Sequence, residues 1–292
     1  MMLSPVGLMN FSNSCHLNVV IQSLFNCRKF NDFLLTLNPF PVHLYPICYV
    51  YLLMYTAFMN RQISTLNPLL KEFHRLLVCS RIQQDAHETW LQVLDKLHQE
   101  LIKNQISQWY FSGQMIHIMQ CKMCNKISPN VEKFEHIILP IGHNEITTVT
   151  QALNGYFMQE IVENGRCLHC NECNQSSKIW HKYLRSIPVY LILILNRFDL
   201  LTKKNNKFID YELVLDVSKY FFPLLKMERV SNTYSLKSII NHQGNFSNGH
   251  YYCYQKYHNE YYMCNDMNIT KIQEINDRVK QNTYILVYEL NE

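Results

Sequence analysis

Apolar residues recur at helical spacing in the first hundred residues and in short strand-like runs after them. Two stretches, 17–24 and 90–101, place apolar residues three or four positions apart, which is the spacing of one helix face. From about Phe111 the pattern changes to runs such as MIHIM, HIILPI, VYLILIL, TYSLKSII, HYYCYQKY and TYILVYEL. Such runs, separated by polar turn-like clusters, are typical of strands. A helical first part followed by a strand-rich second part predicts an α+β fold.

The least polar stretch of the chain, HLYPICYVYLLMYTAFM at residues 43–59, predicts a buried helix. A helix that spans a membrane needs about 20 consecutive apolar residues. This stretch is shorter and rich in tyrosine. We therefore expect a core helix and no membrane insertion.

Composition and charge narrow the class of protein. The chain has 292 residues, of which 48% are hydrophobic and 17% charged, so it is expected to fold around a sizeable core. The formal net charge of +4 does not favour a nucleic-acid binder. The N-terminus lacks a basic region followed by an apolar run, as a secretory signal would have. Eleven cysteines, several in CxxC spacing, favour a reducing compartment, the cytoplasm or the nucleus.

One cysteine, Cys15, lies between turn-forming polar residues and the first apolar helix. Ser12, Asn13 and Ser14 are candidate N-caps for a helix that begins near this cysteine. Backbone N–H groups at a helix N-terminus stabilise an anion, so the position suits a nucleophilic thiolate. The Asn10 amide is a candidate donor to an oxyanion that forms beside the sulfur. A capping turn with an incidental cysteine is the alternative interpretation.

A thiolate nucleophile needs a base, and among 13 histidines the candidate is His250. It follows a glycine-containing turn and opens an alternating strand. Asn265 and Asp266 end the next strand-like run, and two antiparallel strands would bring them beside the histidine. A side-chain oxygen that accepts from one ring nitrogen leaves the other nitrogen for the sulfur. A surface histidine at a hairpin tip, followed by a turn-forming Asn-Asp pair, is the alternative.

Cysteine pairs in CxxC spacing predict a metal site. Cys121 and Cys124 form CKMC, Cys167 and Cys170 form CLHC, and Cys173 extends the second run as CNEC. Tetrahedral zinc is often held by four thiolates from two such pairs. Redox thiols or inert cysteines are the alternatives.

Five motifs of the chain resemble, in order, the sequence boxes of the ubiquitin-specific proteases. GLMNFSNSCHLNVVIQSL resembles the cysteine box of that family, and RIQQDAHETW resembles its QQDAHEF box. VYLILILNRF resembles a later strand motif of the family. HQGNFSNGHYYCY, followed by YYMCNDMNI, resembles its histidine box with the next strand, and TYILVYEL resembles its closing strand. The motifs run from Gly7 to Leu290, which is nearly the whole chain.

The resemblance implies a papain-like cysteine protease fold with a helical thumb, an antiparallel β palm and zinc-ribbon fingers. It implies one catalytic domain over residues 1–292, with the thumb at 1–104, the fingers at 105–133 and 150–190, and the palm at 134–149 and 191–292. The implied activity is that of a deubiquitinase, which hydrolyses the bond after the C-terminal glycine of ubiquitin through a thioester. The implied partners are ubiquitin and ubiquitinated proteins, and we expect a monomer that binds no nucleic acid.

The resemblance also implies roles for single residues, position by position within the boxes. Cys15 matches the nucleophile, His250 matches the general base, and Asn10 matches the residue that stabilises the oxyanion. Asn265 falls where the family has the Asp or Asn that orients the histidine. Asp266 matches the acidic residue that follows it and assists.

For the metal, the family places a small residue and then a lysine after its second cysteine pair. Ser176 and Lys178 fit that pattern when the count starts at Cys167. The expected ligands of a structural Zn²⁺ are therefore Cys121, Cys124, Cys167 and Cys170. The alternative second pair is Cys170 with Cys173.

Three positions depart from the family pattern. Ser12 stands where glycine is usual, and a positive φ there would strain a serine and alter the geometry of Asn10. His16 replaces a Tyr or Phe, and Thr89 replaces a core Phe. All the reacting side chains are retained, so we expect an active enzyme. A weak or inactive ubiquitin-binding member and a protease for a ubiquitin-like modifier are the alternatives.

Overall fold

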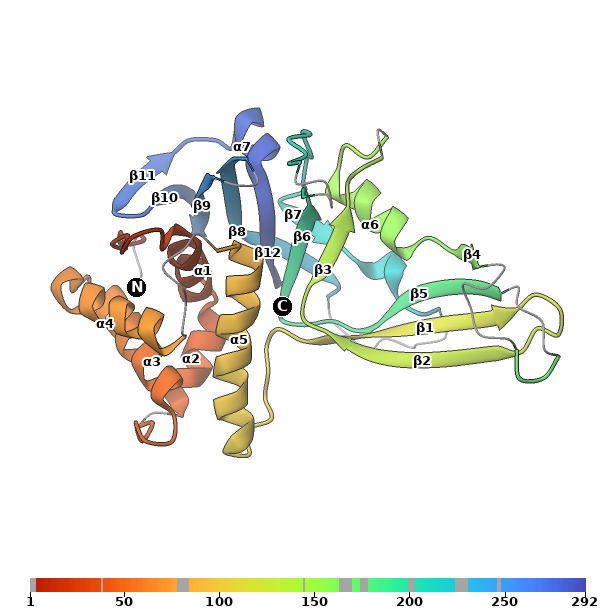
Figure 1. Ribbon diagram of the computed structural model, residues 1–292, viewed down its shortest axis with the longest axis horizontal. Coiled ribbons are helices and arrows are strands. Elements are labelled where there is room, and N and C mark those ends of the chain that lie inside the picture. Colours follow the sequence, from red (N-terminus) through yellow and green to blue (C-terminus); the bar gives the residue numbers. More distant parts are fainter. Residues whose placement is uncertain are drawn as a thin grey trace.

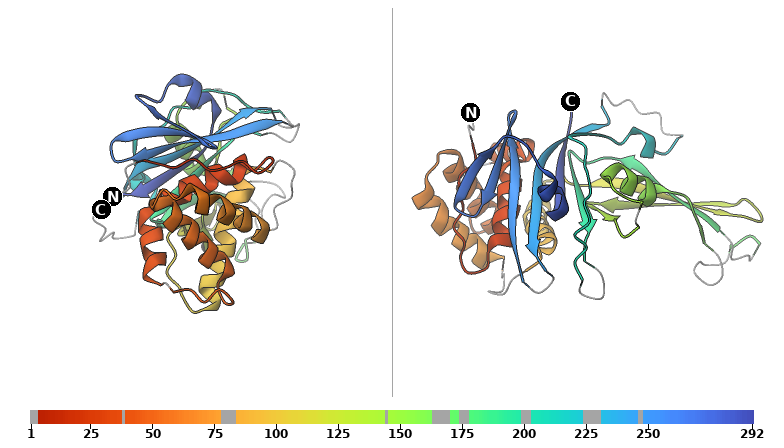
Figure 2. Two further views of the ribbon diagram at one scale, coloured as in Figure 1. Left: turned by 90° about the vertical axis from the view of Figure 1, so that its left-hand side faces the viewer. Right: turned by 90° about the horizontal axis from the view of Figure 1, so that it is seen from above.

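A helical part, a broad β-sheet and a long narrow β-sheet lie in a row along the longest axis of the molecule (Figure 1). The computed structural model describes residues 4–37, 39–77, 84–143, 145–162, 170–173, 178–198, 203–223, 231–245 and 248–292. The narrow sheet extends away from the other two parts, as the view from above also shows (Figure 2).

The first part of the chain is helical, as the apolar spacing predicts. The described helices are α1 (Cys15–Phe25), α2 (Arg28–Thr36), α3 (Pro46–Met59), α4 (Ile63–Leu76), α5 (Ala86–Lys103), α6 (Val149–Phe157), the 3₁₀ helix η1 (Ser218–Tyr220) and α7 (Asp277–Asn282). The apolar stretch at 43–59 forms α3, a core helix, with Pro46 at its first position, where a missing N–H costs nothing. Within the described ranges, every helix is too short or too polar to span a bilayer.

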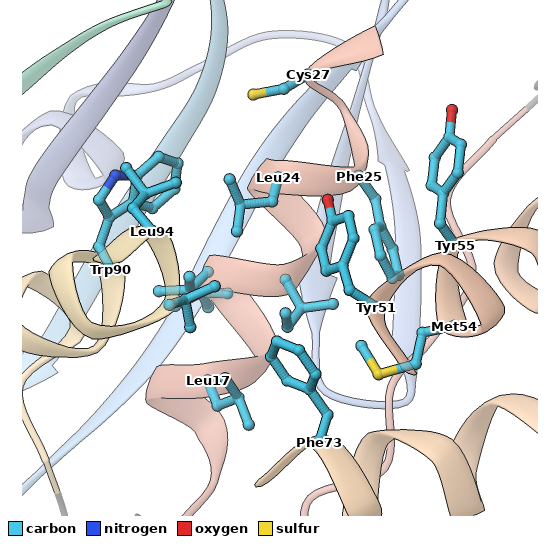
Figure 3. Close-up of a cluster of buried hydrophobic side chains, with 14 of the residues drawn as sticks. Leu17, Leu24, Phe25, Cys27, Tyr51, Met54, Tyr55, Phe73, Trp90 and Leu94 are labelled. Atoms are coloured by element: carbon cyan, nitrogen blue, oxygen red, sulfur yellow. The ribbon is translucent and has the colours of Figure 1, made fainter. Parts of the chain in front are cut away.

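Helix α1 is the centre of the helical part, because all of its residues are buried. Figure 3 shows Leu24 of α1 lying between Trp90 of α5 on one side and Tyr51 of α3 on the other, with Phe25 of α1 packed against Tyr51 and Tyr55. Full burial of one such apolar side chain stabilises a fold by roughly 1.5–3 kcal/mol. Packing on all sides therefore fixes the position of Cys15 at the start of this helix.

The rest of the chain builds two sheets. The described strands are β1 (Gly113–Cys121), β2 (Ile127–Phe134), β3 (Ile137–Pro140), β4 (Glu160–Val162), β5 (Lys178–Ser186), β6 (Tyr190–Asn196), β7 (Val214–Asp216), β8 (Thr233–Gly244), β9 (Gly249–Tyr257), β10 (Glu260–Asn265), β11 (Asn268–Ile272) and β12 (Thr283–Leu290). The broad sheet has the order β11-β10-β9-β8-β12-β6-β3, with β7 paired to β8, and the narrow sheet has the order β2-β1-β5-β4. Each of the six strand-like runs of the sequence overlaps one of these strands, and only HIILPI and VYLILIL extend one residue beyond a strand end. One pair, β3 with β6, is parallel.

The broad sheet separates two cores. Successive side chains of a strand point to opposite faces, so β9 contributes to both. Tyr251 and Cys253 pack with the helical part. Tyr254 belongs to a second core that includes Leu153 of α6 and Val279 of α7. The first of these faces brings α1 and β9 together.

A buried polar network fixes how α1 lies on the sheet. Gln255 of β9 donates from Nε2 to the hydroxyl oxygens of Ser23 in α1 (3.1 Å) and Ser238 in β8 (2.8 Å). Asn26, just after α1, donates from Nδ2 to Gln255 Oε1 (3.1 Å). These four side chains are all buried, and buried polar groups must be paired. The network therefore holds α1 in one position against the strand that carries His250.

Candidate active site and metal centre

Cys15 lies at the first position of α1 and is only 4% exposed. It nevertheless lines a cavity of about 440 Å³. The cavity is also lined by Asp85 and His87, at the start of α5, and by His242 and Tyr251 of the broad sheet. The sulfur therefore borders a cleft between the helical part and the broad sheet.

The predicted start of the helix is right, but the predicted side-chain cap is wrong. Ser14 occupies the N-cap position without a capping hydrogen bond. Its hydroxyl accepts from the N–H of Phe11 (2.8 Å) and donates to Asn10 Oδ1 (3.3 Å), so it faces back into the preceding turn. The Ser14 hydroxyl therefore does not cap the first turn of α1, and N–H groups at a helix N-terminus can stabilise an anion.

In the turn before Cys15, the residue that stands where the family usually has glycine, Ser12, has a positive φ, and so has the next residue. Ser12 has a φ of 52° and Asn13 a φ of 67°, both in the left-handed region. Asn adopts this region readily, whereas the left-handed conformation costs other residues roughly 1–2 kcal/mol. Ser12 thus adopts the left-handed conformation at the cost of backbone strain. Asn10 nevertheless stays bonded to the turn, because its Oδ1 accepts from the N–H of Ser14 (3.0 Å).

The structure brings His250 together with both of its predicted neighbours. His250 lies near the start of β9 and Asn265 at the end of the antiparallel strand β10. His250 Nε2 is 2.6 Å from Asn265 Oδ1, so Nδ1 is left for the cysteine. The hydrogen bond with Cys15 is the largest cause that raises the pKa of His250 to about 9, and the bond with Asn265 adds to it against the effect of burial. This pKa favours an imidazolium beside the sulfur.

Asp266 links the histidine to the turn before Cys15. Its Oδ2 lies 3.9 Å from His250 Nε2 and accepts from Asn10 Nδ2 (2.9 Å). Its Oδ1 accepts from Nδ2 of Asn18 in α1 (2.7 Å). One carboxylate therefore ties the turn after Asn265 to Asn10 and to α1.

The three histidines that line the cavity, His16, His87 and His242, differ from His250, which lies beside Cys15 outside the cavity lining. Burial lowers the pKa of His16 and of His242 to about 4, and it also lowers the pKa of His87. The ring of His87 packs against that of His136, with centroids 4.8 Å apart. These imidazoles are therefore neutral near pH 7, and of the four histidines His250 is the one suited to pair with a thiolate.

Sequence reasoning missed an acidic residue in the wall of the cavity. Asp85 caps α5 by accepting from the N–H groups of His87 and Glu88, and it also accepts from the hydroxyls of Tyr251 (3.2 Å) and Tyr284 (3.0 Å). Burial raises the pKa of both tyrosines, so their hydroxyls remain donors. The signal in the sequence was an aspartate at an N-cap position before an apolar helix.

Comparison with known proteins identifies the family. The sequence matches the family described as ubiquitin carboxyl-terminal hydrolase over residues 6–288. The chain belongs to the ubiquitin carboxyl-terminal hydrolase family. The expected kinship with the ubiquitin-specific proteases is thereby confirmed.

Relatives and solved structures agree with this family. A probable ubiquitin carboxyl-terminal hydrolase of Acanthamoeba polyphaga mimivirus is 31% identical over 61% of this chain and 40% of its own length. The ubiquitin carboxyl-terminal hydrolase nonstop of Drosophila melanogaster is 23% identical over 98% of this chain and 67% of its own length. The matched part of the chain thus spans less than half the length of the first relative and two thirds of the length of the second.

A solved structure in the family shows the same fold. The SAGA Ubp8/Sgf11/Sus1/Sgf73 DUB module bound to ubiquitin aldehyde matches with a TM-score of 0.81 at 20% identity, over 98% of this chain and 70% of the matched one. The expected α+β fold with a helical thumb (α1–α5), a palm (the broad sheet) and fingers (the narrow sheet) is confirmed. The residue boundaries expected between these parts stay a prediction.

Two departures from the hydrolase family pattern compensate each other. Nδ1 of His16 lies 2.8 Å from the hydroxyl oxygen of Thr89, and that hydroxyl donates to the carbonyl of Asp85 (2.8 Å). Because the hydroxyl hydrogen is already used, His16 Nδ1 must be the donor. A hydrogen-bonded pair thus replaces two aromatic side chains of the family pattern.

Four cysteine thiols lie together at the tip of the fingers. They are Cys121, Cys124, Cys170 and Cys173, and their sulfur atoms all lie within 4.8 Å of one another. The described cluster thus contains the alternative second pair, and Cys167 lies outside the described residues. Backbone N–H groups, that of Cys124 first, lower the pKa of Cys121 to about 6. This donor set, with its separations, fits a tetrahedral metal ion.

Proposed function

We propose that this chain is a cysteine-type deubiquitinase, which hydrolyses the isopeptide or peptide bond after the C-terminal glycine of ubiquitin. The observation that carries the proposal is the contact of Cys15 with His250, whose second ring nitrogen is held by Asn265. Membership of a family described as ubiquitin carboxyl-terminal hydrolases supports the choice of substrate. The cavity beside Cys15 would hold the extended tail of ubiquitin.

In the first chemical step, His250 accepts the thiol proton of Cys15, and the thiolate attacks the carbonyl carbon of the terminal glycine. The raised pKa of His250 favours this ion pair. The carbonyl oxygen becomes an oxyanion, for which the proposed donors are the N–H of Cys15 and the side-chain amide of Asn10. An amide nitrogen has two hydrogens, so Asn10 can keep its bond to Asp266 and still donate. Loss of one such donor typically lowers a rate by about 10²–10³-fold.

In the second step, the His250 imidazolium gives its proton to the leaving lysine amine as the C–N bond breaks. The product is a thioester on Cys15. A water molecule then loses a proton to His250 and attacks the thioester carbonyl, and the C–S bond breaks to return the thiolate. Asn265 keeps the imidazole ring in one orientation throughout, and Asp266 positions Asn10 through the bond between them.

We further propose that the cysteine cluster of the fingers holds a structural Zn²⁺. Its ligands would be Cys121, Cys124, Cys170 and Cys173. The metal would stiffen the tips of hairpins that lack a hydrophobic core of their own, since metal binding adds directly to folding free energy. No step of the reaction involves it.

The proposed partners are ubiquitin and ubiquitinated proteins, and the proposed location is the cytoplasm or the nucleus. The nine described cysteines form no disulfide, which suits a reducing compartment. The expectation of a monomer that binds no nucleic acid stays a prediction.

The proposal is tested by hydrolysis of ubiquitin that carries a fluorophore as a C-terminal amide. The wild-type chain should turn over many equivalents, and Cys15→Ala should release fluorophore no faster than buffer. Cys48→Ala is the matched control, because Cys48 is a buried thiol of α3 that donates to the carbonyl of Leu97 (3.8 Å). It should keep the activity of the wild type. Equal turnover by Cys15→Ala, or none by the wild type, would refute the proposal.

A further inference from the structure

We propose that Lys204 is a positioning residue, which fixes the base His250 by holding the end of β8. Lys204 follows β6 in the chain and is half-buried. Its ammonium donates to the carbonyl of His242 (2.6 Å) and to that of Gly244 (3.4 Å). Both carbonyls lie at the C-terminal end of β8, some forty positions after Lys204 in the sequence. The inference deepens the proposed function and rests on it for one of the two tests below.

The end of β8 needs such a partner because one of its neighbours stops short. The pairing of β12 with β8 ends at Thr283 and Asn241, so residues 242–244 pair only with β9 among the described strands. Carbonyls of alternate residues in a strand point to the same edge. At this edge the ammonium of Lys204 takes the place of the missing strand. Without it, the partly buried carbonyl of His242 would lose this partner, at a cost in free energy, whereas the exposed carbonyl of Gly244 could turn to water.

The held residues are the ones that contact the base. Gln243, which lies between the two bonded carbonyls, is the pairing partner of His250. The ring of His242 packs on Gly249, the residue directly before His250: a Cβ at Gly249 would lie 1.9 Å from His242 Nε2. Movement of this end of β8 would therefore be transmitted to His250 both through the backbone pairing and through the His242 ring.

The segment that carries Lys204 is itself anchored to the palm. The buried guanidinium of Arg197 donates to the carbonyls of Asn205 (2.9 Å) and Lys207 (2.8 Å), and Phe198 forms a β-bridge with Lys204. Two charged or titratable groups face the ammonium, Arg197 and the neutral ring of His242. The segment that carries the Lys204 ammonium is thus held in place by these contacts, as a positioning role requires.

Three variants separate positioning from ordinary structural support. Lys204→Met removes the donor and keeps most of the stem, and Lys204→Arg restores a donor. Lys207→Met is the matched control, since Lys207 is equally half-buried but donates to the carbonyl of His143 (2.6 Å), away from the β8–β9 hairpin. On fluorogenic ubiquitin, Lys204→Met should lower kcat about 10- to 100-fold, as a small displacement of a catalytic group does. KM should be unchanged, Lys204→Arg should recover part of kcat, and Lys207→Met should match the wild type.

The second test needs no ubiquitin, so it remains decisive if the proposed function fails. Alkylation of Cys15 by iodoacetamide is followed as a function of pH, with the modified site identified by mass spectrometry. When His250 is held beside the sulfur, the imidazolium favours the thiolate, so Lys204→Met should move the alkylation profile to higher pH and Lys207→Met should not. If Lys204→Met does not fold, Lys204→Gln, which keeps an N–H donor on a shorter stem, takes its place. A lowered melting temperature with an unchanged alkylation profile, or an unchanged kcat in a folded variant, would overturn the proposal.

Discussion

At the scale of single residues, His250 carries the chemistry because two hydrogen bonds outweigh its burial. Burial lowers the pKa of the three histidines that line the cavity, since it penalises the charged form. Burial also acts to lower the pKa of His250, yet its hydrogen bonds to Cys15 and Asn265 raise that pKa to about 9. The difference lies in the partners and not in the residue type.

This pKa shift predicts a change of stability with pH. The pKa of His250 in the folded chain, about 9, lies above its ordinary value of 6.5. Protonated His250 therefore stabilises the fold fully below pH 6.5, and the contribution is lost as the pH rises toward 9. The difference in free energy of unfolding between the wild type and His250→Gln should shrink across that window. The side chain is 41% exposed, so solvent screening keeps the effect small. Urea unfolding on both sides of the window measures it, and a constant difference would argue against the pairing with Cys15.

Ser12 offers a test of backbone strain next to the nucleophile. With a φ of 52°, it should be stabilised by replacement with glycine, which has no Cβ to strain. Ser12→Gly should raise the free energy of unfolding by up to about 1 kcal/mol, which is the left-handed penalty less the entropy that glycine loses. Asn13→Gly is the control at a φ of 67° and should gain less, because asparagine tolerates this region. A loss of stability in Ser12→Gly would show that the serine side chain contributes more than its strain costs.

The residues that act within one local motif could be predicted, and those that act across the fold could not. Cys15, His250 and Asn265 each lie in a short stretch that resembles a sequence box of the family, and that resemblance decided between the catalytic interpretation and the alternatives that the turn and strand pattern left open. The partners of Asp85 are tyrosines more than a hundred positions away. Alternation along a strand gives the face on which a tyrosine lies, but not which carboxylate it meets there.

At the scale of elements, the fingers show what a sheet without a core requires. Strand β2 exposes every residue from Ile127 to Lys133, so burial contributes little to holding it. The thiol cluster joins its hairpin, through Cys121 and Cys124, to the segment with Cys170 and Cys173. A metal at this tip would supply the stabilisation that apolar contacts do not.

Metal content should distinguish the two sets of ligands. Cys173→Ser should abolish stoichiometric zinc, measured by mass spectrometry of the native protein, and should lower the melting temperature. Cys167→Ser, the control chosen from the set first expected from the sequence, should retain one zinc ion per chain. A full zinc content in Cys173→Ser together with loss in Cys167→Ser would restore the first set expected from the sequence.

The elements themselves followed from the sequence more reliably than their ends. The strand-like runs from MIHIM to TYILVYEL all became strands, because side-chain alternation and β-branched content act locally. The expected cap of α1 failed because the Ser14 hydroxyl met Asn10 and Phe11 of its own turn. The outcome of that competition depends on the two positive φ values just before it, which the sequence alone does not reveal.

At the scale of the whole molecule, α1 is a helix of the thumb that also packs against the palm. The network of Gln255, Ser23, Ser238 and Asn26 lies at this junction. The order of strands could not be predicted, because β12, last in the chain, inserts between β8 and β6. Only the completed sheet determines which face of β9 meets α1.

Removal of the centre of this network should destabilise the fold. Gln255→Leu leaves the buried hydroxyls of Ser23 and Ser238 and the amide of Asn26 without this partner, which should lower the free energy of unfolding by about 1–3 kcal/mol. The control is Gln273→Leu, at an exposed position after β11, which should change it little. Equal effects in urea unfolding would mean that the network does not hold the thumb on the palm.

The most direct measurement is the intact mass of the chain after incubation with ubiquitin that carries a C-terminal electrophile. We predict a shift by one ubiquitin, located at Cys15, retained in Cys48→Ala and absent in Cys15→Ala and in wild type first blocked with iodoacetamide. Parallel probes made from ubiquitin-like modifiers should react more slowly. Failure of the folded wild-type chain to form the adduct, or an adduct at another cysteine, would contradict the assignment of Cys15 as the nucleophile of a deubiquitinase.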